Sequence, residues 1–418
     1  MATFFSPIKV GNVHLEHRVV LAPLTRFRAT RSEHVPVVPL VKEYYEQRGS
    51  VPGTLLVSEA TFIAPEAGGY SYVPGIWSSD QIKAWKKITD GVHAKRSYIF
   101  LQLWALGRTA TASVLTEEGN YPLVAPSPIS LSGSPSDAPA PRALSIAQID
   151  RYVGFYVQAA KNAIEAGFDG VEIHGANGYL IDQFLQDVSN TRTDEYGGNI
   201  ENRSRFGLRV VDEVVKAIGA EKTAIRLSPW GRFQDMKMHD PIPQFSHFVS
   251  SLVESHPKLA FVHLVEPPPI AERTDVKHLS KIPEESNDFI RKIWAPRPLV
   301  TTGGYTREDA LKVVADNKGA LVGFGRHFIS NPDVPFRLEH NLPLTPVDRS
   351  TIYTPSDKKG TEKGYIDYPF SEEFLKERNS NSKAHSVPEE RHVVESAVLV
   401  GLVGLIGFQA LSWWRGSR

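Results

Sequence analysis

The chain has 418 residues, of which 41% are hydrophobic and 22% charged, and this ordinary globular composition excludes disorder over most of its length. Its 47 basic and 47 acidic residues cancel to a net charge of zero, so the composition indicates no nucleic-acid partner. Cysteine is absent, which excludes disulfides, thiolate nucleophiles and cysteine-ligated metals.

Short apolar runs of strand length recur along the first 370 residues, and each leads into a loop and then a helical pattern. Such strands alternating with helices indicate a parallel sheet covered by helices. Eight units without a break favour an α/β fold of the closed (β/α)8 TIM-barrel type over an open doubly wound sheet. The predicted strands occupy residues 19–22, 54–57, 98–103, 170–173, 223–227, 260–264, 298–301 and 320–323.

Two glycine-bearing loops follow the seventh and eighth predicted strands. The first carries Gly303 and Gly304, and the second carries Gly325 and Arg326. Glycines let backbone N–H groups approach an anion, and an arginine can pair with a phosphate through two hydrogen bonds. These are the usual phosphate-binding loops of the fold. The two loops therefore predict a phosphate site, the alternative being that the glycines only close tight turns.

The segment HGANGY, which follows the fourth predicted strand, carries His174, Asn177 and Tyr179. A histidine and an amide three residues later can direct two donors at one carbonyl oxygen that gains negative charge. A tyrosine hydroxyl, with an ordinary pKa near 10, can give a proton to a strongly basic carbon. A histidine at a strand end can instead be a hydrogen-bonded core residue, and spacing alone leaves that alternative open.

Gln102 and Arg226 stand at two further strand ends, and a buried arginine there needs an anion or several acceptors. Other barrel chemistries fit less well. His174 and His263 stand alone rather than in a metal-ligand cluster, so no metal site is predicted. No strand end carries the lysine of a Schiff-base aldolase, and no strand is followed by a Gly-x-Gly-x-x-Gly nicotinamide motif.

Residues 397–414, AVLVGLVGLIGFQALSWW, contain no charged residue and reach about the shortest length that spans a bilayer. Trp413 and Trp414 stand where interfacial aromatic residues belong. We expect a transmembrane helix over residues 393–414 that anchors the chain to a membrane with its catalytic body in the cytosol. The alternative is a buried helix docked on that body. A polar linker is expected over residues 375–392, after a barrel domain over residues 1–374.

Several long motifs resemble those of the old yellow enzymes, the FMN-dependent ene reductases, in their thiol-free fungal and plant branch. The resemblance covers about residues 4–370. Its motifs include PLTR at 23–26, GGY at 68–70, LQLW at 101–104, VEIHGANGY at 171–179, SNTRTDEYGG at 189–198 and GYIDYP at 364–369.

The resemblance implies a TIM-barrel oxidoreductase with tightly bound FMN and with NADPH as hydride donor. His174 and Asn177 would bind the substrate carbonyl, and Tyr179 would protonate the α-carbon. The residues implied to bind the cofactor are Pro23, Leu24, Thr25, Gln102, Arg226, Gly303, Gly304, Gly325 and Arg326. Those implied to line the substrate pocket are Tyr70, Trp104, Phe233 and Tyr365.

The implied reaction is ping-pong transfer of hydride from NADPH to FMN and then to the β-carbon of an α,β-unsaturated aldehyde or ketone. One alternative is a flavin-dependent oxidase or isomerase of specialised metabolism on the same scaffold. Another is a catalytically silent flavoprotein that serves as a membrane adaptor. The presence of Tyr179 favours the reductase, since loss of the proton donor is one route toward isomerase behaviour.

Overall fold

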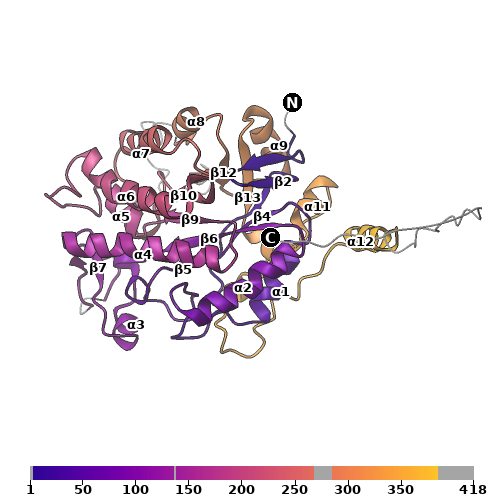
Figure 1. The fold of residues 1–418 in the computed structure, drawn as a ribbon, viewed down its shortest axis with the longest axis horizontal. Coiled ribbons are helices and arrows are strands. Elements are labelled where there is room, and N and C mark those ends of the chain that lie inside the picture. Colours follow the sequence, from indigo (N-terminus) through magenta and orange to yellow (C-terminus); the bar gives the residue numbers. More distant parts are fainter. Residues whose placement is uncertain (1–2, 136–137, 268–284, 385–418) are drawn as a thin grey trace, which may run out of the picture. The chain divides into compact units, whose positions relative to one another are not determined.

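Eight parallel strands form a closed ring in the computed structural model, which describes residues 3–135, 138–267 and 285–384 (Figure 1). The last strand of the ring pairs with the first, with Val322 opposite Val19, so the predicted barrel is confirmed. In ring order the strands are β3 (Val19–Leu21), β4 (Leu55–Val57), β6 (Tyr98–Trp104), β9 (Gly170–Gly175), β10 (Thr223–Leu227), β11 (Phe261–Val265), β12 (Leu299–Thr302) and β13 (Ala320–Phe324).

The amino-terminal end of the barrel is filled by apolar side chains. An antiparallel hairpin of β1 (Ile8–Val10) and β2 (Val13–Leu15) contributes Val10 and Val13 to this cluster. They belong to the same cluster as Phe100 of β6 and Phe261 of β11, whose ring centroids lie 5.5 Å apart although β9 and β10 stand between their strands in the ring. Because this end is apolar, the polar chemistry of the barrel is concentrated at the carboxyl ends of the strands, as in other barrels of this type.

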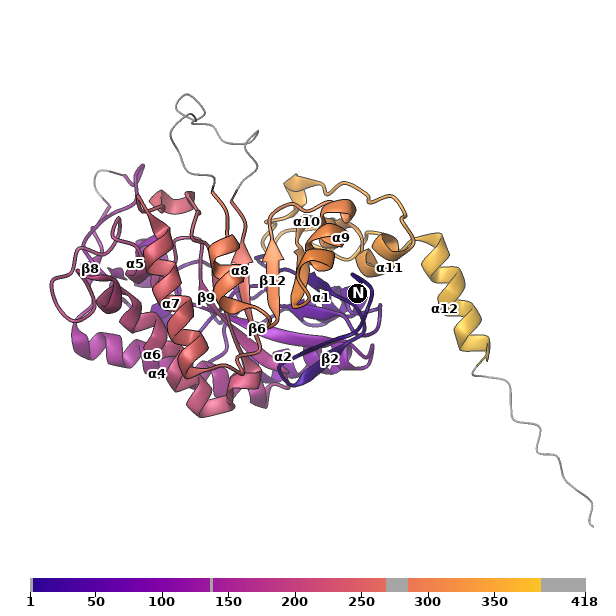
Figure 2. The same cartoon turned by 90° about the horizontal axis from the view of Figure 1, so that it is seen from above.

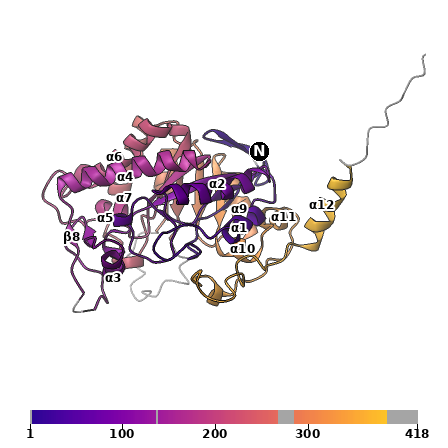
Figure 3. The same cartoon turned by 60° about the horizontal axis from the view of Figure 1, so that its bottom comes forward.

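Helices cover the outer face of the strands, and their apolar sides form the largest hydrophobic cluster. Helices α4 and α6 run side by side (Figures 1 and 3), and α7 and α8 pack together beside β12 (Figure 2). Ser78 and Ser145 start α2 and α4 with capping boxes, which stabilise helix amino termini. The covering helices are α1 (Leu40–Arg48), α2 (Ser79–His93), α4 (Ile146–Glu165), α6 (Ile200–Ile218), α7 (Pro241–Ser255), α8 (Asp288–Trp294) and α9 (Arg307–Asp316).

Shorter elements lie in the connections between the strands and the covering helices. They are β5 (Thr61–Phe62), which extends the sheet beside β6, the pair β7 (Val124–Ala125) and β8 (Arg142–Ala143), and the helices α3 (Ala112–Glu117), α5 (Leu180–Leu185), α10 (Arg326–Ser330) and α11 (Val334–Glu339). The chain divides into two units between Phe374 and Leu375, and the barrel belongs to the first.

The prediction of a transmembrane helix, and with it of a membrane-anchored localisation, is corrected by the structure. Within the described ranges no helix is long and apolar enough to cross a bilayer. The last described helix, α12 (Glu372–Ala384), has 13 residues, about 20 Å at 1.5 Å per residue, whereas a bilayer core is about 30 Å thick. It also begins with two glutamates and stands where the sequence predicted a linker. The stretch at 393–414 lies outside the described residues.

Candidate active site

A cavity of about 780 Å³ opens at the carboxyl ends of the strands. Its walls come from the segments that follow β3, β9, β10, β11, β12 and β13. Of the predicted site residues, it brings together Pro23, Leu24, Asn177, Arg226, Phe233, Gly303, Gly304, Gly325 and Arg326. Residues predicted from several different strand ends therefore share one cavity, because parallel strands in a barrel all end on the same side.

Gln102 and Arg226 belong to a buried polar layer across the barrel. Gln102 donates from Nε2 to Glu172 at 2.7 Å, and Arg226 donates from Nη2 to the Thr302 hydroxyl at 3.3 Å. Burial lowers the pKa of Arg226, and the nearby Glu172 carboxylate opposes that change. The Nε of Arg226 is buried without a hydrogen-bond partner in the described part of the chain. Such an unsatisfied donor at the cavity wall fits a bound acceptor.

His174, Tyr179 and Trp104 lie together beside this layer. The ring centroids of His174 and Tyr179 are 5.0 Å apart, and those of Trp104 and Tyr179 are 4.7 Å apart. His174 Nδ1 accepts a hydrogen bond from the Ala176 N–H at 3.4 Å, so the ring hydrogen is on Nε2. Burial first, and then the positive charge of Arg226, holds the pKa of His174 well below its ordinary value. His174 is therefore a neutral hydrogen-bond donor.

Asn177 lies at the wall of the cavity in a left-handed conformation with φ of 59°. Asparagine tolerates this region better than most residues. Its backbone N–H donates to the Ser228 hydroxyl at 2.7 Å, and its backbone carbonyl accepts from Gln234 at 2.8 Å. These contacts hold the main chain of Asn177 in place at the cavity wall.

Tyr179 and Tyr70 have different hydroxyl environments. Burial and the neighbouring Tyr70 raise the pKa of Tyr179, while the Gln234 side chain opposes the rise. The Tyr70 hydroxyl donates to the Thr109 carbonyl at 2.8 Å and so has its hydrogen engaged. The raised pKa means that the Tyr179 hydroxyl keeps its proton at neutral pH.

The glycine loops form part of the cavity wall. Gly304 has φ of 78°, which disfavours any side chain, and a Cβ on Gly303 would come 2.5 Å from the Cβ of Glu266. Arg326 lies there beside His327. Arg349 also lines the cavity. It was not predicted as a site residue, because it lies far along the chain from any predicted strand end. The sequence offered no signal for it.

Trp104 and Tyr70 lie near Tyr179, whereas Tyr365 does not lie with them. Trp104 and Tyr70 pack with their ring centroids 5.8 Å apart. Tyr365 is fully buried elsewhere, stacked on Tyr44 at 4.3 Å, and so the structure does not bring it into the predicted substrate pocket.

Phe233 and Thr25 complete the predicted set. Phe233 lines the cavity with 66% of its surface exposed, and Thr25 is half-buried directly after the cavity residue Leu24. The neighbouring Arg26 backbone N–H donates to the buried Glu59 carboxylate at 3.3 Å. This contact holds the segment after β3 against the end of β4.

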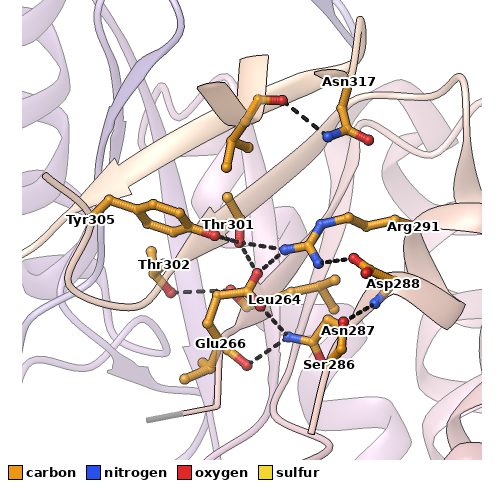
Figure 4. Close-up of polar contacts among 12 residues, drawn as sticks. Leu264, Glu266, Ser286, Asn287, Asp288, Arg291, Thr301, Thr302, Tyr305 and Asn317 are labelled. Atoms are coloured by element: carbon orange, nitrogen blue, oxygen red, sulfur yellow. Dashed lines mark hydrogen bonds and ion pairs between the residues drawn. The ribbon is translucent and has the colours of Figure 1, made fainter. Parts of the chain in front are cut away.

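An ion-pair network supports the loop that carries Gly303. Glu266, at the end of β11, pairs with Arg291 of α8 and accepts from the Thr301 hydroxyl and from Asn287 (Figure 4). Glu266 also lines the cavity. Arg291 therefore neutralises a carboxylate that would otherwise repel an anion bound at the glycine loops.

For FMN, the cofactor that the resemblance implies, we expect Arg291→Met to weaken binding by at least about tenfold, which is about 1.4 kcal/mol, because Glu266 would remain as an uncompensated negative charge. The measurement is a titration of FMN fluorescence with the cofactor-free chain. The double variant Glu266→Gln with Arg291→Met is the control and should regain most of the affinity. A single variant that binds FMN like the original chain would contradict the role given to Arg291.

The chain matches a known family over most of its length. A family model described as "NADH:flavin oxidoreductase / NADH oxidase family" matches residues 3–345. The chain is 50% identical over 380 residues to a chanoclavine-I aldehyde reductase of Penicillium roqueforti, in a match that covers 90% of this chain and 98% of that protein. The structure matches an old yellow enzyme from Pichia sp. AKU4542 with a TM-score of 0.80 and 41% identity, over 88% of this chain and 94% of that one.

The chain belongs to the old yellow enzyme family. It also matches morphinone reductase in complex with tetrahydroNAD, with a TM-score of 0.78 and 37% identity over 89% of this chain and 98% of that one. The chain is thus an FMN-dependent oxidoreductase with NAD(P)H as hydride donor. The cavity fits FMN, since its lining includes the unpartnered Arg226 Nε and also the glycine loops with Arg326.

Proposed function

We propose that this old yellow enzyme family member reduces the carbon–carbon double bond of α,β-unsaturated aldehydes and ketones, using NADPH in a ping-pong reaction. The main support for this proposal is that a neutral His174 donor and a protonated Tyr179 lie 5.0 Å apart, measured between their ring centroids. One relative is an aldehyde reductase by name, and this supports an aldehyde among the substrates.

Arg226, Gln102 and the residues Pro23, Leu24 and Thr25 would hold the ring of FMN, and the glycine loops with Arg326 would hold its phosphate. When bound, FMN would supply the redox chemistry of hydride transfer between the nicotinamide and the β-carbon.

The protein's own contribution is to orient the substrate and move a proton. The His174 Nε2–H and the Asn177 side-chain amide donate to the substrate carbonyl oxygen and stabilise the negative charge that develops there. The Tyr179 hydroxyl then gives its proton to the α-carbon. Trp104 packs edge-on against Tyr179 and so holds the ring of the proton donor in place. The presence of this donor favours the reductase over the oxidase or isomerase alternative.

The test uses the purified chain under anaerobic conditions. We expect a flavin visible spectrum that bleaches with NADPH and returns when cyclohexenone is added. A colourless chain that FMN cannot reconstitute would refute the cofactor site. A flavoprotein that NADPH reduces but cyclohexenone does not reoxidise would instead refute the ene-reductase proposal and favour the oxidase or isomerase.

The reaction of the reduced enzyme with cyclohexenone should be independent of pH between about 6.5 and 10, the ordinary pKa values of histidine and tyrosine. His174 stays neutral because its pKa lies well below that range, and Tyr179 keeps its proton because its pKa lies above it. Single-turnover absorbance measurements check this, with reduction by NADPH over the same range as the control. An inflection confined to the cyclohexenone step would contradict the protonation states assigned here.

A further inference from the structure

Glu172 is a buried carboxylate in the middle of β9, two residues before His174. It is completely buried, and a buried carboxylate is costly unless each oxygen has a partner. Its Oε1 accepts from Gln102 Nε2 at 2.7 Å, and its Oε2 lies 2.6 Å from His263 Nδ1. Glu172 thus joins three strands of the barrel at one level.

Strand register brings these groups together. Gln102 of β6 lies opposite Glu172, and Arg226 of β10 lies opposite both His174 and His263. The hydroxyl of Thr302 on β12 lies 3.2 Å from His263 Nε2 and accepts from Arg226 at 3.3 Å. A continuous chain of polar contacts therefore runs from Gln102 to Arg226, with Glu172 as its acidic member.

The Glu172 carboxylate decides how the Gln102 amide is turned. A carboxylate can only accept, so the NH₂ end of the amide must face it and the amide oxygen must face away. The same reasoning applies to His263. Burial lowers its pKa, so it is neutral, and its Nδ1–H donates to the carboxylate.

Glu172 also balances the charge of Arg226. Both groups are charged in the same buried layer, and the carboxylate opposes the loss of the Arg226 proton. Arg226 donates a hydrogen bond to the Thr302 hydroxyl, which is neutral and so does not balance the charge of the guanidinium. Without the carboxylate, the positive charge of this layer would be uncompensated.

We propose that Glu172 is a positioning residue of the flavin site. It turns the Gln102 amide toward the cofactor, and by offsetting the charge of Arg226 it sets the reduction potential of bound FMN. The inference rests on the proposed contacts of Gln102 and Arg226 with FMN. Reduction adds negative charge to the flavin ring, so a carboxylate in the layer that supports it makes reduction less favourable.

Glu172→Gln tests this, because the amide keeps the shape and can still accept from Gln102. We expect the equilibrium for reduction of bound FMN to shift toward the reduced form by at least about tenfold, which is about 30 mV for a two-electron couple. The potential is measured by equilibration with a reference dye. The matched control is Glu165→Gln, which removes a carboxylate from the exposed side of α4 and should leave the potential unchanged. An unchanged potential in Glu172→Gln, or an equal shift in both variants, would overturn the proposal.

Glu172→Asp provides a second measurement if the glutamine variant does not fold. The shorter side chain keeps the charge but cannot reach both Gln102 and His263, whose contacts are 2.7 and 2.6 Å in the original chain. We expect a potential close to the original with FMN affinity at least about fivefold lower, which is about 1 kcal/mol. Unchanged FMN affinity would refute the positioning role. An original chain that binds no FMN would refute the proposed function itself, which distinguishes the two failures.

Discussion

Tyr179→Phe should slow the reaction of the reduced enzyme with cyclohexenone by about 10²- to 10⁴-fold, the usual contribution of a positioned general acid. Phenylalanine keeps the ring packing against Trp104 and His174 but cannot donate a proton. Reduction by NADPH should stay close to the original rate, because no proton from Tyr179 is needed in that half-reaction. Stopped-flow absorbance measures the two half-reactions separately.

The matched control for this prediction is Tyr70→Phe. Tyr70 packs in the same aromatic cluster, but its hydroxyl donates to the Thr109 carbonyl and is not free to protonate a substrate. We expect a much smaller effect on the cyclohexenone step. Equal losses in both half-reactions of Tyr179→Phe, or an equal loss in the Tyr70 variant, would rule out Tyr179 as the proton donor.

His174→Ala should reduce turnover of cyclohexenone by about 10²- to 10³-fold, as expected when one of two donors to a developing oxyanion is removed. It should also weaken binding of a phenolate, which resembles an enolate, by about ten- to a hundredfold, because hydrogen bonds to charged groups are worth about 1.5–3 kcal/mol. The charge-transfer absorbance of the phenolate complex reports the affinity.

His174→Asn is the comparison that separates the donor from the ring. The asparagine amide can restore an N–H donor but not the packing of the imidazole, whose centroid lies 6.2 Å from that of Trp104. Phenolate affinity should therefore recover in part. If His174→Ala binds phenolates as tightly as the original chain does, the carbonyl-binding role is wrong, and His174 is the hydrogen-bonded core residue that the spacing also allowed.

The apolar runs were sufficient to predict the barrel, and the strand ends were sufficient to predict many residues that line one cavity. A buried parallel strand is apolar along most of its length, so the pattern of β9 or β10 is visible locally. Once eight such runs are found, closure of the ring brings all their carboxyl ends to one side. Arg226 and Gly303, 77 positions apart in the chain, could therefore be assigned to one site from the order of the strands alone, and both line the same cavity.

The contacts of side chains in the irregular loops could be assigned only from the tertiary structure. Tyr365 belongs to a motif that the resemblance placed at the pocket, yet it stacks on Tyr44 of α1 because Arg26 and Arg28 pack over its ring, with cation–ring distances of 4.8 and 4.7 Å. Arg349 reaches the cavity from the same carboxyl-terminal region. Loops of this kind carry no periodic signal, so their side chains cannot be placed without the fold.

The carboxyl-terminal region and the buried polar layer both show the difference between features that are local in the sequence and features that depend on the fold. The strand runs, the glycine loops and the segment HGANGY could be recognised in the sequence, because each consists of residues that are near one another in the chain. The prediction for the region after the barrel was wrong. The structure has the polar helix α12 there, and no helix among the described residues is long and apolar enough to cross a bilayer. The pairing of Glu172 with Gln102 and His263 was decided only by the register of neighbouring strands, which brings together residues 70 and 91 positions apart.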